Sequence, residues 1–304
     1  MFKFFSSVGI QLIKIPFLLL FIYIVGFTLA FVVARPFYLT LLSETNGSMG
    51  LDVLVSKFSF MYFSDFLSVS GKALKPFQSL ILLIGAIYIF LNIYFSGGIL
   101  DSFKNKSFNF SSFFSSCTNY FGRFILLYVY SFWLLIILLG LTYLLFSIFV
   151  RFASGGNERT YFFALLPPLA IMLQLIGFVI VQNDYGKVII GQNPSLKPSE
   201  AFWNSMIFIW RNPSTLIAFW IIVFAGLLSA IMYLLLDNSI GMHSGITIFV
   251  MFIIQQLFVF FRTFLKVLTL AYANEFFLLK APLTFSPDSL NLTQNLNLDE
   301  QTAV

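Results

Sequence analysis

The sequence predicts an all-α fold: a polytopic membrane helix bundle with six transmembrane helices, cytoplasmic interfacial amphipathic helices and an internal repeat of about 88 residues. Three observations predict this fold class. Hydrophobic residues make up 59% of the chain and charged residues only 10%, whereas a soluble domain carries about 25% charged residues. Six apolar segments are long enough to cross a bilayer, and one succession of elements recurs along the chain.

A helix that crosses the hydrocarbon layer needs about 20 apolar residues. The six segments that qualify are 15–33, 77–95, 124–150, 161–182, 214–236 and 246–272. The first follows Lys3 and Lys14 as a secretory signal would, but its apolar run is longer than the roughly 7 to 15 residues of a signal core. We therefore expect an uncleaved signal anchor.

The distribution of positive charge predicts the orientation, because cytoplasmic loops carry an excess of Lys and Arg. With both termini in the cytoplasm, the inner segments hold Lys3, Lys14, Lys104, Lys106, Arg123, Lys187, Lys197, Arg211 and Lys280. We expect a single integral membrane domain over 1–280 in the inner membrane, followed by a disordered cytoplasmic tail over 281–304 that is rich in Asn, Leu and Asp.

Three amphipathic segments precede spans, at the N-terminus, at 108–121 and at 199–211. At 100° per residue, large apolar side chains share one arc of each segment, and Ser, Thr, Asn, Lys or Arg lie opposite, with Ser205 on the polar arc of the third. The apolar arcs hold Phe4, Phe5, Val8 and Leu12; Phe110, Phe113, Phe114, Cys117, Tyr120 and Phe121; and Phe202, Trp203, Met206, Ile209 and Trp210.

Each of these segments is expected to lie in the cytoplasmic membrane interface, with its apolar face at the acyl boundary. Each leads into its span across a breaker or small residue, namely Pro16, Gly122 or Pro213, so we expect a helix break at each place. Two roles stay open from the sequence: the segments either only anchor the bundle and set its depth, or also handle lipid and shape the membrane.

The repeat is visible at a spacing of about 88 residues. Gly98 corresponds to Gly186, and the span segment 124–146 corresponds to 214–236. Each copy is predicted to contain a span that ends in a short polar signature, followed by an amphipathic segment and a second span. The repeat predicts an architecture and indicates no chemistry.

Candidate binding residues lie inside the predicted bundle. Gln255, Arg262 and Lys266 fall within about 20° on one face of the last span. A charge at the bilayer centre costs about 2.5 to 3.5 kcal/mol, so such a residue lines a cavity or has a partner. Asp184, at the inner end of the fourth span, is the expected counter-ion of Arg262, and Lys187 lies one turn later.

Three interpretations of these polar residues stay open. The cations either snorkel to lipid phosphates, with or without a structural Asp184–Arg262 pair, or form a binding site for a substrate or lipid headgroup. A proton relay is the third, although His243 is the one His of the chain. The small pair Gly226 and Ala230 permits close helix approach in the fifth span.

Several function classes are disfavoured by composition. The single Cys117 excludes an intrachain disulfide and a cysteine-cluster metal site, and the single His243 excludes a His pair. The net charge of +5 is scattered along the chain, which indicates topology bias rather than nucleic-acid binding. No phosphate loop, zinc motif or nucleophile elbow is present in the sequence. We expect no enzyme activity, no cofactor and no metal.

The segments 184–187 (Asp-Tyr-Gly-Lys), 198–201 (Pro-Ser-Glu-Ala) and 210–213 (Trp-Arg-Asn-Pro) support a resemblance over roughly 1–280. The chain resembles a group of uncharacterised bacterial six-span membrane proteins. It is similar to the membrane domain fused to some bacterial glycerophosphodiester phosphodiesterases. The soluble catalytic barrel of those fusions has no counterpart in this sequence, so the resemblance implies no phosphodiesterase activity and transfers no functional residue.

The sequence therefore favours a non-enzymatic inner-membrane protein that binds or organises membrane lipid or supports a partner protein. The alternative is a permease or transporter with a polar site near the cytoplasmic side of the bundle. The candidate binding residues for either function are Asp184, Lys187, Gln255, Arg262 and Lys266.

Overall fold

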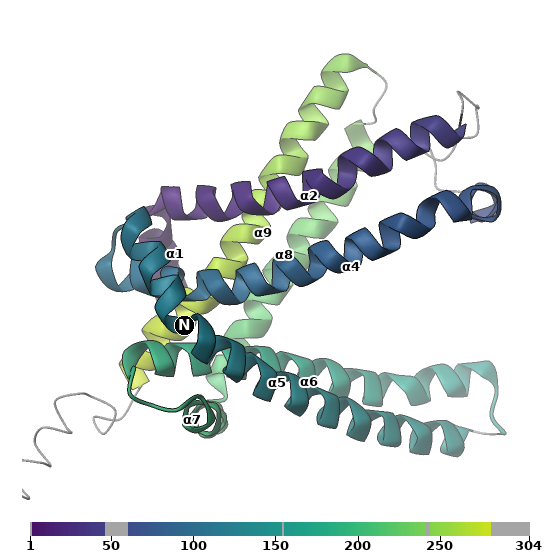
Figure 1. Cartoon of the computed structure of the whole chain (residues 1–304). Helices are drawn as coiled ribbons and strands as arrows, with labels where there is room; N and C mark the ends of the chain where they lie inside the picture. The colour runs from purple at the N-terminus through teal and green to yellow at the C-terminus, as the bar shows by residue number, and fades with distance from the viewer. Residues whose placement is uncertain (1, 46–59, 154, 241–243, 281–304) are drawn as a thin grey trace, which may run out of the picture. The chain divides into compact units, whose positions relative to one another are not determined.

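The computed structural model of the chain describes residues 2–45, 60–153, 155–240 and 244–280. Every element in these ranges is an α-helix (Figure 1). The helices are α1 (Phe2–Ile13), α2 (Pro16–Thr45), α4 (Phe60–Asn105), α5 (Phe110–Ala153), α6 (Glu158–Gln192), α7 (Pro198–Arg211), α8 (Ser214–Ile240) and α9 (Gly245–Lys280). The predicted tail at 281–304 lies outside the described residues, as does His243.

Six of the described helices are long and apolar enough to cross a membrane. They carry the spans Pro16–Thr40, Lys75–Asn105, Phe110–Phe152, Glu158–Gln192, Ser214–Ile240 and Gly245–Lys280. The six predicted spans fall on these six helices, so the all-α class and the multi-pass architecture are confirmed.

The chain forms two compact units. The first unit consists of Leu20–Asn92, and the second consists of Met1–Leu19 together with Ile93–Val304. In the first unit, α2 and α4 meet where the rings of Phe37 and Phe77 form a T-shaped pair, with ring centroids 5.5 Å apart. In the second unit, α6 packs against α5, α7, α8 and α9 (Figure 1). α9 packs additionally against α1 and α8, so α6 and α9 form the centre of this unit.

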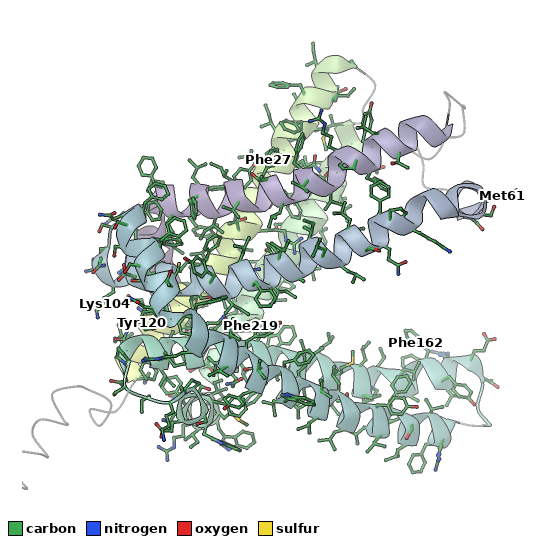
Figure 2. The ribbon with its side chains drawn as sticks, in the orientation of Figure 1. Phe27, Met61, Lys104, Tyr120, Phe162 and Phe219 are labelled. Carbon is green, nitrogen blue, oxygen red and sulfur yellow. The ribbon has the colours of Figure 1, made fainter. Side chains whose placement is uncertain are left out.

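The buried core of the second unit lies along the C-terminal half of α6. Val188, Ile189 and Ile190 are at most 1% exposed, whereas Phe162 near the start of the same helix is 61% exposed (Figure 2). The C-terminal half of α5 likewise has exposed apolar side chains, such as Tyr143 and Phe152. Exposed apolar side chains in such number are typical of a surface solvated by lipid tails.

Proline explains two of the helix breaks that the sequence predicts. α2 begins at Pro16 and α8 begins directly after Pro213, because proline lacks the N–H that a helix interior needs. α7 begins with Pro198 at its first helical position, and the Glu200 carboxylate accepts a hydrogen bond from the Lys197 backbone N–H at 3.3 Å.

The predicted break at Gly122 is wrong. α5 runs without interruption from Phe110 to Ala153, a length of 44 residues or about 66 Å at 1.5 Å per residue. Glycine costs a helix only about 1 kcal/mol relative to alanine and keeps its backbone N–H, so it does not end a helix as proline does. The hydrocarbon layer is about 30 Å thick, so α5 is longer than the length needed to cross it.

Orientation is a prediction that cysteine labelling tests. Ser115 in the first turns of α5 and Asn238 at the end of α8 are both exposed, while the native Cys117 is buried. With cytoplasmic termini, a membrane-impermeant maleimide should label Asn238→Cys in intact cells and Ser115→Cys only after permeabilisation. The unmodified chain is the matched control, and labelling of Ser115→Cys in intact cells would show the opposite orientation.

Candidate functional site

A groove of about 460 Å³ runs between α8 and α9. Its α8 residues recur every three or four positions and therefore share one helix face. Gly226 and Ala230, whose side chains are small, lie on this face. The α8–α9 groove is lined by Phe219, Ile222, Val223, Gly226, Leu227 and Ala230 from α8 and by Arg262, Leu265, Lys266 and Thr269 from α9.

Two cationic side chains, Arg262 and Lys266, line the otherwise largely apolar α8–α9 groove. Arg262 and Lys266 are one helical turn apart and both are exposed. The guanidinium carbon of Arg262 lies 5.9 Å from the centroid of the Phe258 ring, a cation–π contact. Within the described ranges the ion pair found is between Asp184 and Lys187, so Arg262 has no carboxylate partner there.

The expected Asp184–Arg262 pair is therefore corrected. Lys187 Nζ donates to Asp184 Oδ1 at 3.3 Å, and their side chains are 12% and 18% exposed respectively. The two residues are three positions apart on α6, where side chains are neighbours on the helix surface. Lys187 on the same helix, and not Arg262 of α9, is therefore the ion-pair partner of Asp184. Gln255 is exposed on α9 and is not among the residues that line the α8–α9 groove.

Asp184 lines a second and much smaller cavity of about 10 Å³, which we call the Asp184 pit. The pit is lined by Val181, Asp184, Tyr185, Thr215, Phe219, Ile222, Thr269, Tyr272 and Ala273. Phe219, Ile222 and Thr269 line both this pit and the α8–α9 groove, so the two cavities adjoin. Structure therefore brings four of the five predicted residues to one region: Asp184 with its partner Lys187, and Arg262 with Lys266.

The buried hydroxyl of Tyr185 is a feature that the sequence does not reveal. Tyr185 is 2% exposed, and its hydroxyl oxygen has no hydrogen-bond partner in the described part of the chain. Its ring packs on Phe208 of α7, with ring centroids 5.1 Å apart. A buried polar group without a partner is uncommon in folded proteins and calls for an explanation.

A second polar feature that sequence reasoning missed is a hydrogen-bonded cluster among α5, α6 and α7. Ser131 Oγ donates to Gln182 Oε1 at 2.8 Å, and Gln182 Nε2 donates to Ser205 Oγ at 3.0 Å. Asn183 Nδ2 donates to Ser131 Oγ at 3.1 Å. Gln182 and Ser205 are fully buried, so the cluster joins three helices and leaves no open polar surface. The sequence signal that could have predicted this cluster is the pair of adjacent amide residues, Gln182 and Asn183, at the end of an apolar span.

The expected polar arc of α7 is also corrected. Ser205 and Ile209 are buried against the neighbouring helices, whereas Trp203 and Trp210 on the opposite face are 61% and 84% exposed. α7 packs on α5 and α6, so the protein, not the cytosol, covers Ser205. The expected lipid face of α1 shows the same effect, because its Val8 and Leu12 are buried in the protein.

The exposed face of α7 borders an apolar groove of about 480 Å³. It is lined by Leu134, Leu138, Leu175, Phe178, Trp203, Met206, Ile207, Trp210 and Arg211. Its walls come from α5, α6 and α7, and Arg211 is its one charged lining residue.

The depth of α7 is a prediction that tryptophan fluorescence tests. Trp203 and Trp210 should lie at the headgroup level with their rings toward lipid, where amphipathic aromatic rings are enriched. In a variant with Trp133→Phe and Trp220→Phe, brominated phospholipids should quench both remaining tryptophans. Trp203→Phe added to this background isolates Trp210. Absence of quenching would show that this face is covered by protein or stands in water.

Comparison of the chain with protein-family models, with curated proteins and with solved structures finds no match. Among the described residues, His, Cys, Asp and Glu form no group of three that could hold a metal ion.

Proposed function

We propose that this multi-pass membrane protein is a non-enzymatic inner-membrane protein that binds phospholipid in the α8–α9 groove. The observation that supports this function is the combination of one apolar groove with Arg262 and Lys266 on its wall. A phospholipid matches it, because its acyl chains are apolar and its phosphate is a strong partner for Arg and Lys.

The depth of the two cations fits a headgroup site. Arg262 lies 17 residues after Gly245, or about 25 Å along α9 at 1.5 Å per residue. Lys266 lies 21 residues after Gly245, or about 31 Å. The hydrocarbon layer is about 30 Å thick, so if it begins at Gly245, Lys266 lies in the headgroup region toward the C-terminal end of α9. Arg262 lies one turn deeper and can extend its side chain toward the same phosphate.

The permease alternative requires a polar pathway across the bundle. The deeply buried amide groups of Gln182 and Asn183 are bonded to Ser131 and Ser205, which uses their hydrogen-bonding capacity for structure. The α8–α9 groove has mostly apolar walls, which favour an acyl chain over a hydrated solute. Lipid binding is therefore the better-supported function, and transport or support of a partner protein stays a prediction.

Native mass spectrometry of the delipidated protein in detergent tests this proposal. The protein is titrated with dioleoylphosphatidylethanolamine and, separately, with dioleoylphosphatidylglycerol. The variant Arg262→Gln/Lys266→Gln should bind both lipids at least about tenfold more weakly, because a hydrogen bond to a charged group contributes about 1.5 to 3 kcal/mol.

The matched control for this experiment is Arg159→Gln/Lys280→Gln. Both control residues are exposed, and Arg159 also lies over a phenylalanine ring, at 5.8 Å from the Phe163 centroid. The control removes the same net charge and should bind lipid as the unmodified chain does. Equal losses in the two variants would indicate nonspecific charge attraction, and no loss in the groove variant would contradict the proposed site.

A further inference from the structure

The Asp184 pit offers hydrogen-bond acceptors. The Asp184 carboxylate can only accept hydrogen bonds, and of its two oxygens Oδ1 is bonded to Lys187. Thr215 donates its hydroxyl proton to the Asn212 carbonyl, and Thr269 donates to the Leu265 carbonyl. Both threonine oxygens therefore keep lone pairs that can accept. A group with several N–H donors and a positive charge suits this lining, and an anion is disfavoured by the carboxylate.

Tyr185 supplies the independent observation that this pit is a binding site. Its side chain is 2% exposed, and its hydroxyl is buried without a partner in the described residues although the residue lines the pit. A buried hydroxyl that stays unbonded destabilises the fold, whereas a bound polar group that completes the hydrogen bond removes this cost. Tyr185, with its unbonded hydroxyl, and Asp184 thus line the same small cavity.

The position of the pit relates it to the lipid groove. Along α9, Arg262 comes first, Lys266 follows one turn later, and Thr269, which lines both cavities, comes three residues after Lys266. The rise from Lys266 to Thr269 is therefore about 4.5 Å. In a phosphoethanolamine headgroup, the ammonium lies beyond the phosphate across a two-carbon link. A phosphate at Lys266 places such an ammonium toward Thr269 and the pit.

The size of the pit limits what it can hold. A volume of about 10 Å³ corresponds to roughly one water-sized sphere. A primary ammonium group is close to this size, whereas a trimethylammonium group is much larger and has no N–H to donate. The pit therefore discriminates between phosphoethanolamine and phosphocholine headgroups by size and by hydrogen bonding.

We infer that the phospholipid bound by this protein carries a primary amine. Its phosphate lies at Arg262 and Lys266, and its ammonium enters the pit formed with Asp184 and Tyr185. This inference rests on the proposed function, because it names the headgroup of the lipid in the same groove.

Competition between two lipids tests the inference on the full chain in detergent. Equimolar dioleoylphosphatidylethanolamine and dioleoylphosphatidylcholine are added to the delipidated protein, and native mass spectrometry gives the ratio of the two bound species. The unmodified chain should prefer the ethanolamine lipid by about tenfold, the effect of one hydrogen bond to a charged group. Asp184→Asn should bring the ratio close to one while total lipid binding is retained.

Two further variants keep the test interpretable. Asp184→Asn/Lys187→Gln removes the partner that Asp184→Asn leaves unpaired, and it should show the same lost preference if the single variant does not fold. Asp237→Asn on α8 removes the same charge away from the pit and should keep the ratio of the unmodified chain. Tyr185→Phe should keep or raise the melting temperature without lipid, because it removes an unbonded buried hydroxyl, and it should lower the ratio.

The outcomes separate this inference from the proposed function. Equal binding of both lipids, with binding still dependent on Arg262 and Lys266, would overturn the amine-specific pit and leave the phospholipid site standing. That result is expected if a water molecule occupies the pit. A ratio unaffected by Asp184→Asn would also overturn the inference. If neither lipid bound, the amine-specific pit and the proposed phospholipid site would both be overturned.

Discussion

Replacement of Gly97 by alanine is expected to destabilise the protein by about 1 to 3 kcal/mol, the usual cost of overpacking a well-packed contact. A Cβ atom at Gly97 would lie 2.8 Å from the Ser116 carbonyl oxygen and 3.2 Å from the Cys117 Cα. These are backbone atoms of α5, so no side-chain rotation relieves the contact and the two helices must separate. Thermal unfolding in detergent should show a lower melting temperature.

Gly122→Ala is the matched control for this prediction. Gly122 is also helical, but a Cβ atom there would meet nothing within 4 Å. Alanine should keep or raise the stability at this position, since it favours a helix over glycine by about 1 kcal/mol. Equal melting temperatures for the Gly97→Ala and Gly122→Ala proteins would contradict the close contact between α4 and α5.

Replacement of Gln182 by alanine should cost about 2 to 4 kcal/mol, because it opens a cavity and removes two buried hydrogen bonds. Gln182 is fully buried and joins Ser131 of α5 to Ser205 of α7. The expected result is a clearly lower melting temperature. Gln182→Met nearly keeps the side-chain volume and should lose only the contribution of the two hydrogen bonds, about 2 kcal/mol at about 1 kcal/mol each.

Gln255→Ala provides the comparison for Gln182→Ala. Gln255 is likewise an amide within an apolar span, but it is exposed on α9. Its replacement should change stability by no more than about 0.5 kcal/mol, as is usual for an exposed side chain. If Gln182→Ala were as stable as Gln255→Ala, the buried cluster would not hold α5, α6 and α7 together.

The spans could be predicted from sequence because membrane-crossing length and apolar composition are properties of a single segment. The helix breaks at Pro16 and Pro213 could be predicted for the same reason, because the missing N–H of proline disrupts the helix within one turn of the proline itself. Gly122 has only a weak local preference, and α5 continues through it. Helical periodicity places Ser205 opposite the large apolar residues of α7, but it cannot say that other helices cover that side.

The candidate site could be predicted only in part. Arg262 and Lys266 stand out in the sequence because charges inside a span are costly. The groove beside them depends on how α8 and α9 pack, and periodicity within one helix does not give that packing. The partner of Asp184 was missed for a related reason: Lys187 competes for it within the same helix, at 3.3 Å. The unbonded Tyr185 hydroxyl has no signature in the sequence.

Photo-crosslinking from two neighbouring positions of α8 tests the phospholipid site most directly. Leu227 lines the α8–α9 groove, whereas Leu228 does not, and the two are 55% and 51% exposed. With p-benzoylphenylalanine at either position, the protein in phosphatidylethanolamine-containing membranes should capture lipid. Adding Arg262→Gln/Lys266→Gln should reduce capture at Leu227 several-fold and leave capture at Leu228 unchanged. Equal capture at Leu227 with and without the two cations would contradict a phospholipid held by Arg262 and Lys266.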